Sequence, residues 1–333
     1  MNSATKLAVS LACAVLLAAV AALSIGHAAD SNREAAGHGD AGAVTLTPQH
    51  RLVFRSTAQG SRGRLASVAT AHPGGRRAVA PLSCTRLYAA GGTGLCLRLD
   101  GTLATYQLVI LDAQLKEVRA IPLVGVPNRA RVSPSGRLVA WTVFVTGDSY
   151  NGGKFSTRVG ILDTRTQELV PTLEDWKVTV DGKPYRAADL NFWGVTFTAD
   201  DRGFYATMST HGHRYLVRGD LARHTVTTVR ENVECPSLSP DGTRIAFKSA
   251  IGGDPDRGWR PAVLDLDTLR VTRLAETRNI DDQPAWLDDR TVAYALPRGR
   301  EQPGHSDIWQ VPADGSARAR LLVRDAESPA ALG

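Results

Sequence analysis

The stretch Cys235-Pro-Ser-Leu-Ser-Pro-Asp-Gly-Thr-Arg-Ile-Ala-Phe-Lys-Ser249 decides the fold. It combines a short strand of alternating apolar residues, a Pro-Asp-Gly turn and a second alternating strand. Proline presets φ at such a turn, and aspartate and glycine accept the left-handed conformation that a tight hairpin requires. The stretch therefore predicts an antiparallel β-hairpin.

The same pattern recurs along the chain, at 44–54, 86–97, 130–141, 195–205 and 284–294. The six turns, at Pro48, Gly91, Pro134, Asp200, Pro240 and Asp288, are separated by 43, 43, 66, 40 and 48 residues. A four-stranded propeller blade repeats every 40–45 residues or so. The long third interval indicates an insertion at 174–191, in which Asp181-Gly-Lys predicts a hairpin turn. We expect this insertion to pack on a blade edge or to act as a partner-binding wedge.

A second alternating hairpin follows the first in the repeats, so each unit predicts four antiparallel strands. Six such sheets arranged radially bury their faces against one another and leave only short edges. The sequence therefore predicts an all-β fold, a six-bladed β-propeller of four-stranded antiparallel blades spanning 44–328. The expected blades are 44–83, 84–128, 129–176, 190–234, 235–281 and 282–328.

The first 28 residues have the features of an export signal. Lys6 precedes an uncharged run of 19 residues, 7–25, and the small residues Gly26 and Ala28 suit a cleavage site. Residues 1–28 therefore predict a signal peptide. A retained N-terminal anchor is the alternative, because the run approaches the roughly 20 residues that span a bilayer. The small and polar residues 29–43 predict a flexible lead-in.

Export would place Cys84, Cys96 and Cys235 in a compartment where disulfides persist. Cys84 and Cys235 occupy equivalent places in opposite blades, too far apart for the roughly 4.4–6.8 Å between Cα atoms that a disulfide requires. Cys84 and Cys96 flank one hairpin, whose turn near Ala90 would set them opposite each other. We predict a Cys84–Cys96 disulfide, which leaves Cys235 as a buried free thiol or a reactive one.

The segment Ser239–Phe247, together with 283–286 and 307–311, resembles the WD40-like (PD40) repeats of the TolB family. Details at 84–96, 147–158 and 215–220 are more similar to exported TolB-like propellers of high-GC Gram-positive (actinobacterial) bacteria. The resemblance covers 44–328 and is specific for the fold and weak for activity. TolB proteins carry an N-terminal α/β domain without a counterpart in 29–43, so the resemblance implies the propeller shape and not the contacts of the Tol machinery.

Charge and motifs exclude several functions. The net charge is +6, but the basic residues are scattered, whereas nucleic-acid binders gather them in a patch. Gly147-Asp-Ser149 lacks the final glycine of a nucleophile elbow, and neither a zinc-protease pair nor a phosphate loop occurs. His211-Gly-His213 has no third ligand nearby in sequence, so we interpret it as a polar loop. We expect no catalytic residue, metal, cofactor or nucleic-acid partner.

The sequence favours an exported, monomeric, non-enzymatic scaffold, secreted or associated with the cell envelope. Its membrane contact would be limited to an uncleaved N-terminal segment. One face and its channel mouth would bind a protein or envelope ligand, and a purely structural envelope role stays open. The alternative is a lyase or hydrolase acting on an extracellular glycan or lactone, which would require carboxylates or histidines converging in an axial pocket.

The candidate binding residues come from two places. Residues that open the inner strands of the blades should face the mouth of the channel, and the polar loop 147–153 joins two strands where recognition residues commonly lie. The predicted ligand-binding set is Arg86, Arg129, Arg131, Trp193, Glu234, Asp281, Asp282, Asp148 and Tyr150.

Overall fold

The computed structural model describes residues 43–101, 105–145 and 156–333. These residues form strands and turns without a helix, so none of them belongs to a helix that could cross a membrane. The predicted signal peptide at 1–28 and nearly all of the lead-in at 29–43 lie outside the described residues, as does the loop with Asp148 and Tyr150.

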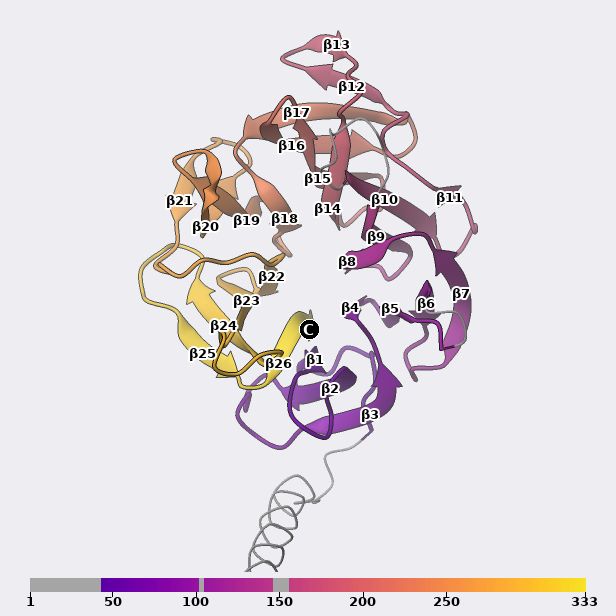
Figure 1. Cartoon of the computed structure of the whole chain (residues 1–333), viewed down its shortest axis with the longest axis vertical. Coiled ribbons are helices and arrows are strands. Elements are labelled where there is room, and N and C mark those ends of the chain that lie inside the picture. The colour runs from indigo at the N-terminus through magenta and orange to yellow at the C-terminus, as the bar shows by residue number, and fades with distance from the viewer. Residues whose placement is uncertain (1–42, 102–104, 146–155) are drawn as a thin grey trace, which may run out of the picture. The chain divides into compact units, whose positions relative to one another are not determined.

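Six sheets are arranged radially about a central axis (Figure 1). This confirms the prediction of an all-β, six-bladed propeller of four-stranded antiparallel blades. The strands nearest the axis are β26 (Ala326–Leu332), β4 (Arg86–Ala90), β8 (Val126–Val132), β14 (Asn191–Phe197), β18 (Glu234–Leu238) and β22 (Ala285–Asp288).

The other strands follow outward in each blade. In the first three blades they are β1 (Arg51–Ser56), β2 (Arg64–Ala69) and β3 (Ala78–Ser83), then β5 (Thr93–Leu99), β6 (Tyr106–Leu111) and β7 (Glu117–Leu123), then β9 (Leu138–Val145), β10 (Ser156–Asp163) and β11 (Leu169–Val170). In the last three they are β15 (Gly203–Thr210), β16 (His213–Asp220) and β17 (Thr225–Glu231), then β19 (Arg244–Ile251), β20 (Asp254–Asp265) and β21 (Val271–Arg273), then β23 (Thr291–Pro297), β24 (Ser306–Pro312) and β25 (Arg320–Val323).

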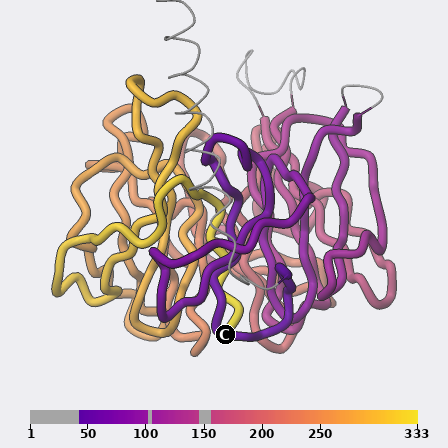
Figure 2. The backbone as a smooth tube through the Cα atoms, turned by 90° about the horizontal axis from the view of Figure 1, so that it is seen from below, coloured from indigo at the N-terminus to yellow at the C-terminus, as the bar shows by residue number. Residues whose placement is uncertain are grey.

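The first blade takes its inner strand from the C-terminal end of the chain. β26 pairs antiparallel with β1, from Arg51 opposite Leu332 to Ser56 opposite Ala326. Figure 2 shows these indigo and yellow segments side by side. The sequence predicts all four strands of this blade within 44–83, whereas its inner strand is Ala326–Leu332. Pairing the two ends of the chain instead closes the ring and leaves β1 without an open edge.

The segment before β1 packs on the second blade and contributes no strand to the first. Leu46 is fully buried, and its backbone N–H donates to the carbonyl oxygen of Ala113 at 2.8 Å. The apolar residues that suggested a first strand at 44–48 therefore cover a blade edge.

The insertion extends the fourth blade outward. β12 (Lys177–Val180) and β13 (Lys183–Tyr185) form a hairpin, and β12 pairs in parallel with β17. The turn residues Asp181 and Gly182 both have positive φ, 49° and 76°, as a two-residue hairpin turn requires. The insertion thus packs on a blade edge.

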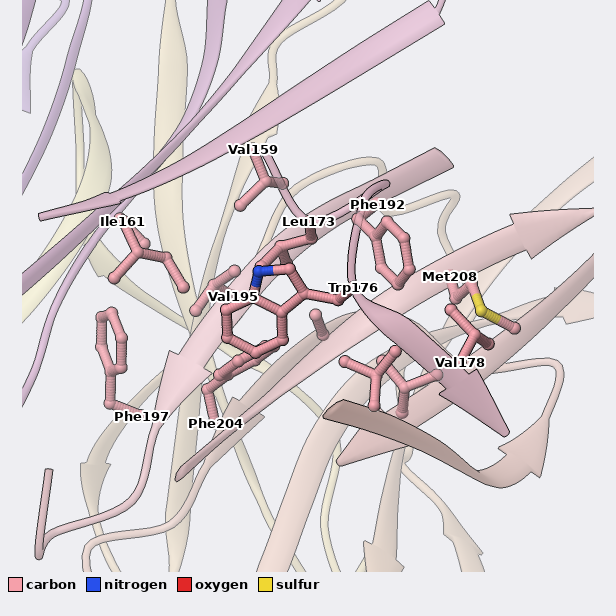
Figure 3. Close-up of a cluster of buried hydrophobic side chains, with 14 of the residues drawn as sticks. Val159, Ile161, Leu173, Trp176, Val178, Phe192, Val195, Phe197, Phe204 and Met208 are labelled. Carbon is pink, nitrogen blue, oxygen red and sulfur yellow. The ribbon is translucent and has the colours of Figure 1, made fainter. Parts of the chain in front are cut away.

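A core cluster between the third and fourth blades holds the insertion in place (Figure 3). The Trp176 side chain packs edge-on against Phe204, with ring centroids 5.6 Å apart, and stacks on His224 at 4.9 Å. Trp176 is only 8% exposed. Aromatic rings of this size bury enough apolar surface to fix the insertion against the blade.

Cys84 and Cys96 form the predicted disulfide, with their Cα atoms 5.4 Å apart. The expected hairpin register was wrong, however, because the turn lies at Gly91 and Gly92 and sets Leu87 opposite Cys96. Cys84 instead precedes β4, so the bond connects β5 to the segment that enters the second blade. Cys235 is buried and carries a free thiol.

A charged cluster at the propeller axis as candidate functional site

Charged side chains from several blades meet where the inner strands begin. Six of the residues that the sequence singled out take part, and two residues on outer strands join them. We call this set the axial cluster: Arg86, Arg129, Arg131, Arg214, Glu234, Lys248, Asp281 and Asp282.

Arg129 lies at the centre of the axial cluster, and its side chain is 9% exposed. Its guanidinium nitrogens are 3.9 Å from a carboxylate oxygen of Asp281 and 4.0 Å from one of Asp282. Asp282 also lies 3.7 Å from Arg86. Burial lowers the pKa of Arg129, but the neighbouring Cys235 and Asp282 outweigh burial, so the pKa stands above its ordinary value and the charge is retained.

Glu234 and Lys248 form the second part of the cluster. Glu234 lies 2.5 Å from Nε of Arg214 and 3.4 Å from Nζ of Lys248, which also pairs with Asp281. Burial raises the pKa of Glu234 despite the opposing charges of Lys248 and Arg214. The Lys248 ammonium lies 4.4 Å from the centroid of the Trp259 ring, which provides a third favourable contact for this buried cation.

Two side chains at the axis connect different blades. Arg131 of the third blade donates a hydrogen bond to the carbonyl oxygen of Pro284, and its guanidinium lies 4.2 Å from the centroid of the Tyr88 ring. Gln283 donates to the carbonyl oxygens of Val195, at 3.2 Å, and Pro236, at 2.9 Å. These bonds connect the sixth blade to the third, fourth and fifth.

The axial cavity is consequently small, about 30 Å³. Its lining includes Arg86, Arg129, Arg131, Asp282 and Gln283. A space of this size holds one or two water molecules or a group of similar size.

The surface end of the axial cluster forms the mouth of the channel. There the Asp281 side chain is 68% exposed, and the side chains of Arg86 and Arg214 are part-exposed. Trp193 is half-buried on β14, opposite Thr207, and makes no hydrogen bond or ion pair with the axial cluster in the described ranges. Trp193 is therefore not part of the axial cluster, although it belongs to the predicted ligand-binding set.

Sequence reasoning missed Lys248 and Arg214 because they stand on β19 and β16, outside the inner strands. Lys248 did carry a signal, since it is one of only six lysines and lies within the alternating strand of the repeat that decides the fold. A lysine inside a buried strand is expected to have a partner.

The chemistry of the cluster is that of charge pairing. Each of its carboxylates lies within 4 Å of an arginine or lysine nitrogen. Burial raises the pKa of Asp281, but the charges of Lys248 and Arg129 lower it below its ordinary value overall. In the part of the chain that the structure describes, no three acidic, histidine or cysteine residues gather in a way that could hold a metal ion. The alternative of a glycan or lactone enzyme finds no support in this arrangement.

Comparison with known proteins places the fold. No family model matches the chain. A segment of 98 residues is 32% identical to a protein described as a TolB homolog from Chlorobium chlorochromatii, a match that covers 29% of this chain and 20% of the relative. The chain therefore matches only a fifth of that relative's length.

Solved structures agree on the architecture. TolB from Acinetobacter baumannii superposes with a TM-score of 0.61 at 18% identity, covering 85% of this chain and 66% of that chain. A chain of a nidogen/laminin complex gives a TM-score of 0.54 at 8% identity, covering 85% of this chain and 98% of the other. The fold is thus a TolB-like six-bladed β-propeller.

Proposed function

We propose that this protein is an exported, non-enzymatic propeller scaffold that binds a protein or cell-envelope ligand at the channel mouth. The observation that carries the proposal is the axial cluster, in which partly exposed charges at the mouth stand on a buried base of ion pairs. A preorganised set of charged groups on a closed scaffold suits recognition, because little freedom is lost on binding. The mixture of signs favours a ligand that itself carries both charges.

Export is supported by two features of the chain. The Cys84–Cys96 disulfide is typical of proteins in oxidising, extracytoplasmic compartments. Residues 1–28 have the composition of a signal peptide, so we propose a secreted or envelope-associated protein that acts as a monomer and binds no nucleic acid. The likeness to TolB supports a protein as the partner class.

The test is site-specific photocrosslinking in the native envelope. A photoreactive residue replacing Asp281, at the mouth, should capture a discrete partner, whereas the same residue at Arg223, whose side chain is 80% exposed on the fourth blade, should not. The double variant R86A/D281A should lose the partner in a pull-down while remaining folded. Equal capture at both positions, or an unchanged pull-down by the double variant, would refute the proposal.

A further inference from the structure

We propose that the axial cavity is a binding site for a carboxylate group, held by the guanidinium groups of Arg129 and Arg131 together with Arg86. The inference deepens the proposed function. It rests on that function only where the carboxylate belongs to a partner protein. The site itself is argued from the cavity and its lining residues.

The first observation is a pair of buried donors without partners. Nε of Arg129 and Nε of Arg131 are inaccessible to solvent and make no hydrogen bond within the described ranges. The Arg129 side chain is 9% exposed and Arg131 is 4% exposed. Leaving a buried N–H of a charged group unsatisfied costs about 1–3 kcal/mol or more, so each of these groups normally has a partner.

The second observation is that both arginines line one cavity. They are separated by a single residue on β8, and the ladder with β9 is regular from Arg129 to Val132, so their side chains leave the same face of the strand. Arg86 reaches the same cavity from β4. Three arginines from two neighbouring inner strands thus line a space of about 30 Å³, together with Gln283 and with Asp282, whose carboxylate lies 3.7 Å from Arg86 and 4.0 Å from Arg129.

The third observation is the charge of the surroundings. The axial cluster contains five cations, Arg86, Arg129, Arg131, Arg214 and Lys248, and three carboxylates, Glu234, Asp281 and Asp282, which leaves an excess of two positive charges. The least exposed members alone are three cations, Arg129, Arg131 and Lys248, and two carboxylates, Glu234 and Asp282, and a buried excess of positive charge is stabilised by an anion.

The size and chemistry of the site narrow the ligand. The cavity accommodates one small group and excludes a bulky anion. Planar guanidinium groups match the two oxygens of a carboxylate, with which they form paired charge-assisted hydrogen bonds. The carboxylate could be a free small acid or an acidic side chain or terminus that a partner inserts through the mouth.

The experiment uses formate as the probe and follows the melting temperature of the whole protein at constant ionic strength, balanced with a bulky sulfonate. Formate should raise the melting temperature with saturation, and R131M should weaken its apparent affinity by about tenfold or more. The matched control R223M removes an arginine whose side chain is 80% exposed and which does not belong to the axial cluster. This variant should respond like the natural protein. A response that is linear and equal in all three proteins would overturn the inference.

A second measurement guards against a variant that folds poorly. Crystals of the natural protein soaked in bromide, which replaces the carboxylate as a heavy anion, should show anomalous density between Arg129 and Arg131. Density for water alone at that position would contradict the site.

The source of the carboxylate is then resolved with the crosslinked partner. Competition of formate with the partner would identify an inserted acidic group, and saturable formate binding without competition would identify a free small acid. If no partner is captured and formate still binds, the proposed scaffold function fails and the carboxylate site stands. If a partner is captured and formate has no effect, the scaffold function stands and the carboxylate site is refuted.

Discussion

Arg131 on β8 donates a hydrogen bond from Nη2 to the carbonyl oxygen of Pro284, 3.1 Å away and 153 residues later in the sequence. The third and sixth blades lie opposite each other in the ring, so this bond spans the axis (Figure 1). The same guanidinium stacks on Tyr88 of the second blade. One side chain therefore connects three blades.

Replacing Arg131 by methionine should lower the free energy of unfolding by about 1–2 kcal/mol. The hydrogen bond from a charged group contributes about 1.5–3 kcal/mol and the cation–π contact with Tyr88 adds to it, and removal of the unsatisfied Nε offsets part of the loss. Equilibrium denaturation by urea measures the change, with R223M as the control that should stay within about 0.5 kcal/mol of the natural protein. A loss as small as that of the control would show that the bond across the axis does not stabilise the ring.

Glu174 should make the stability fall as the pH rises. Both of its carboxylate oxygens are buried without a hydrogen-bond partner among the described residues, and burial raises its pKa to about 7, with the charge of Arg158 opposing and that of Asp175 assisting. Because the folded pKa exceeds the unfolded value, the associated stability is complete below about pH 4.5 and is lost as the pH rises through 7.

The variant E174Q tests this pH dependence, because glutamine keeps the shape and cannot ionise. It should match the natural protein at pH 4 and be more stable by about 2 kcal/mol at pH 8, measured by urea denaturation at both values. The exposed Glu168, which does not act on the pKa of Glu174, supplies the control E168Q. An equal difference between E174Q and the natural protein at both pH values would contradict the burial of an ionisable carboxyl.

Trp176 should contribute strongly to the attachment of the insertion. Removing a buried tryptophan side chain costs about 3–5 kcal/mol, since its contacts with Phe204 and His224 are lost and a cavity remains. W176A should therefore unfold at a lower urea concentration and should expose the β12–β13 hairpin to limited proteolysis first. The adjacent exposed Lys177 gives the control K177A, which should leave both measurements unchanged.

The disulfide should stabilise the second blade. The double variant C84A/C96A should lose about 2–3 kcal/mol, because the bond closes a short loop in the unfolded chain. Mass spectrometry after alkylation of the denatured, unreduced protein should find Cys235 modified and Cys84 and Cys96 unmodified. Alkylation of all three would show that the bond does not form.

The parts of the fold that could be predicted are those set by local sequence. The Pro-Asp-Gly turn ends in Gly242 with φ of 73°, and its N–H donates to the carbonyl oxygen of Ser239, an interaction between near neighbours in the chain. The inner strand of the first blade could not be found in this way. Ala326–Leu332 contains a proline and lacks regular alternation, and its pairing with β1 joins the two ends of the chain.

The candidate site also contains residues that local sequence could predict and residues that it could not. Residues that open inner strands converge because the blades repeat around an axis, so Arg86, Arg129 and Asp282, chosen by position, line one cavity. Trp193 does not join them. The ladder of β14 shifts between Trp193 and Thr196, where Gly194 has φ of 65°, and a shift of this kind redirects the side chains beside it. Such an irregularity has no clear mark in a single sequence.

The pairing of β26 with β1 also governs the order of events in folding. β1 is synthesised well before its neighbour on the axial side, Ala326–Leu332, so the ring stays open until that later strand has been made. Contacts between such distant segments form slowly. For the exported protein proposed above, this delay would keep the early strands from completing the ring before transport.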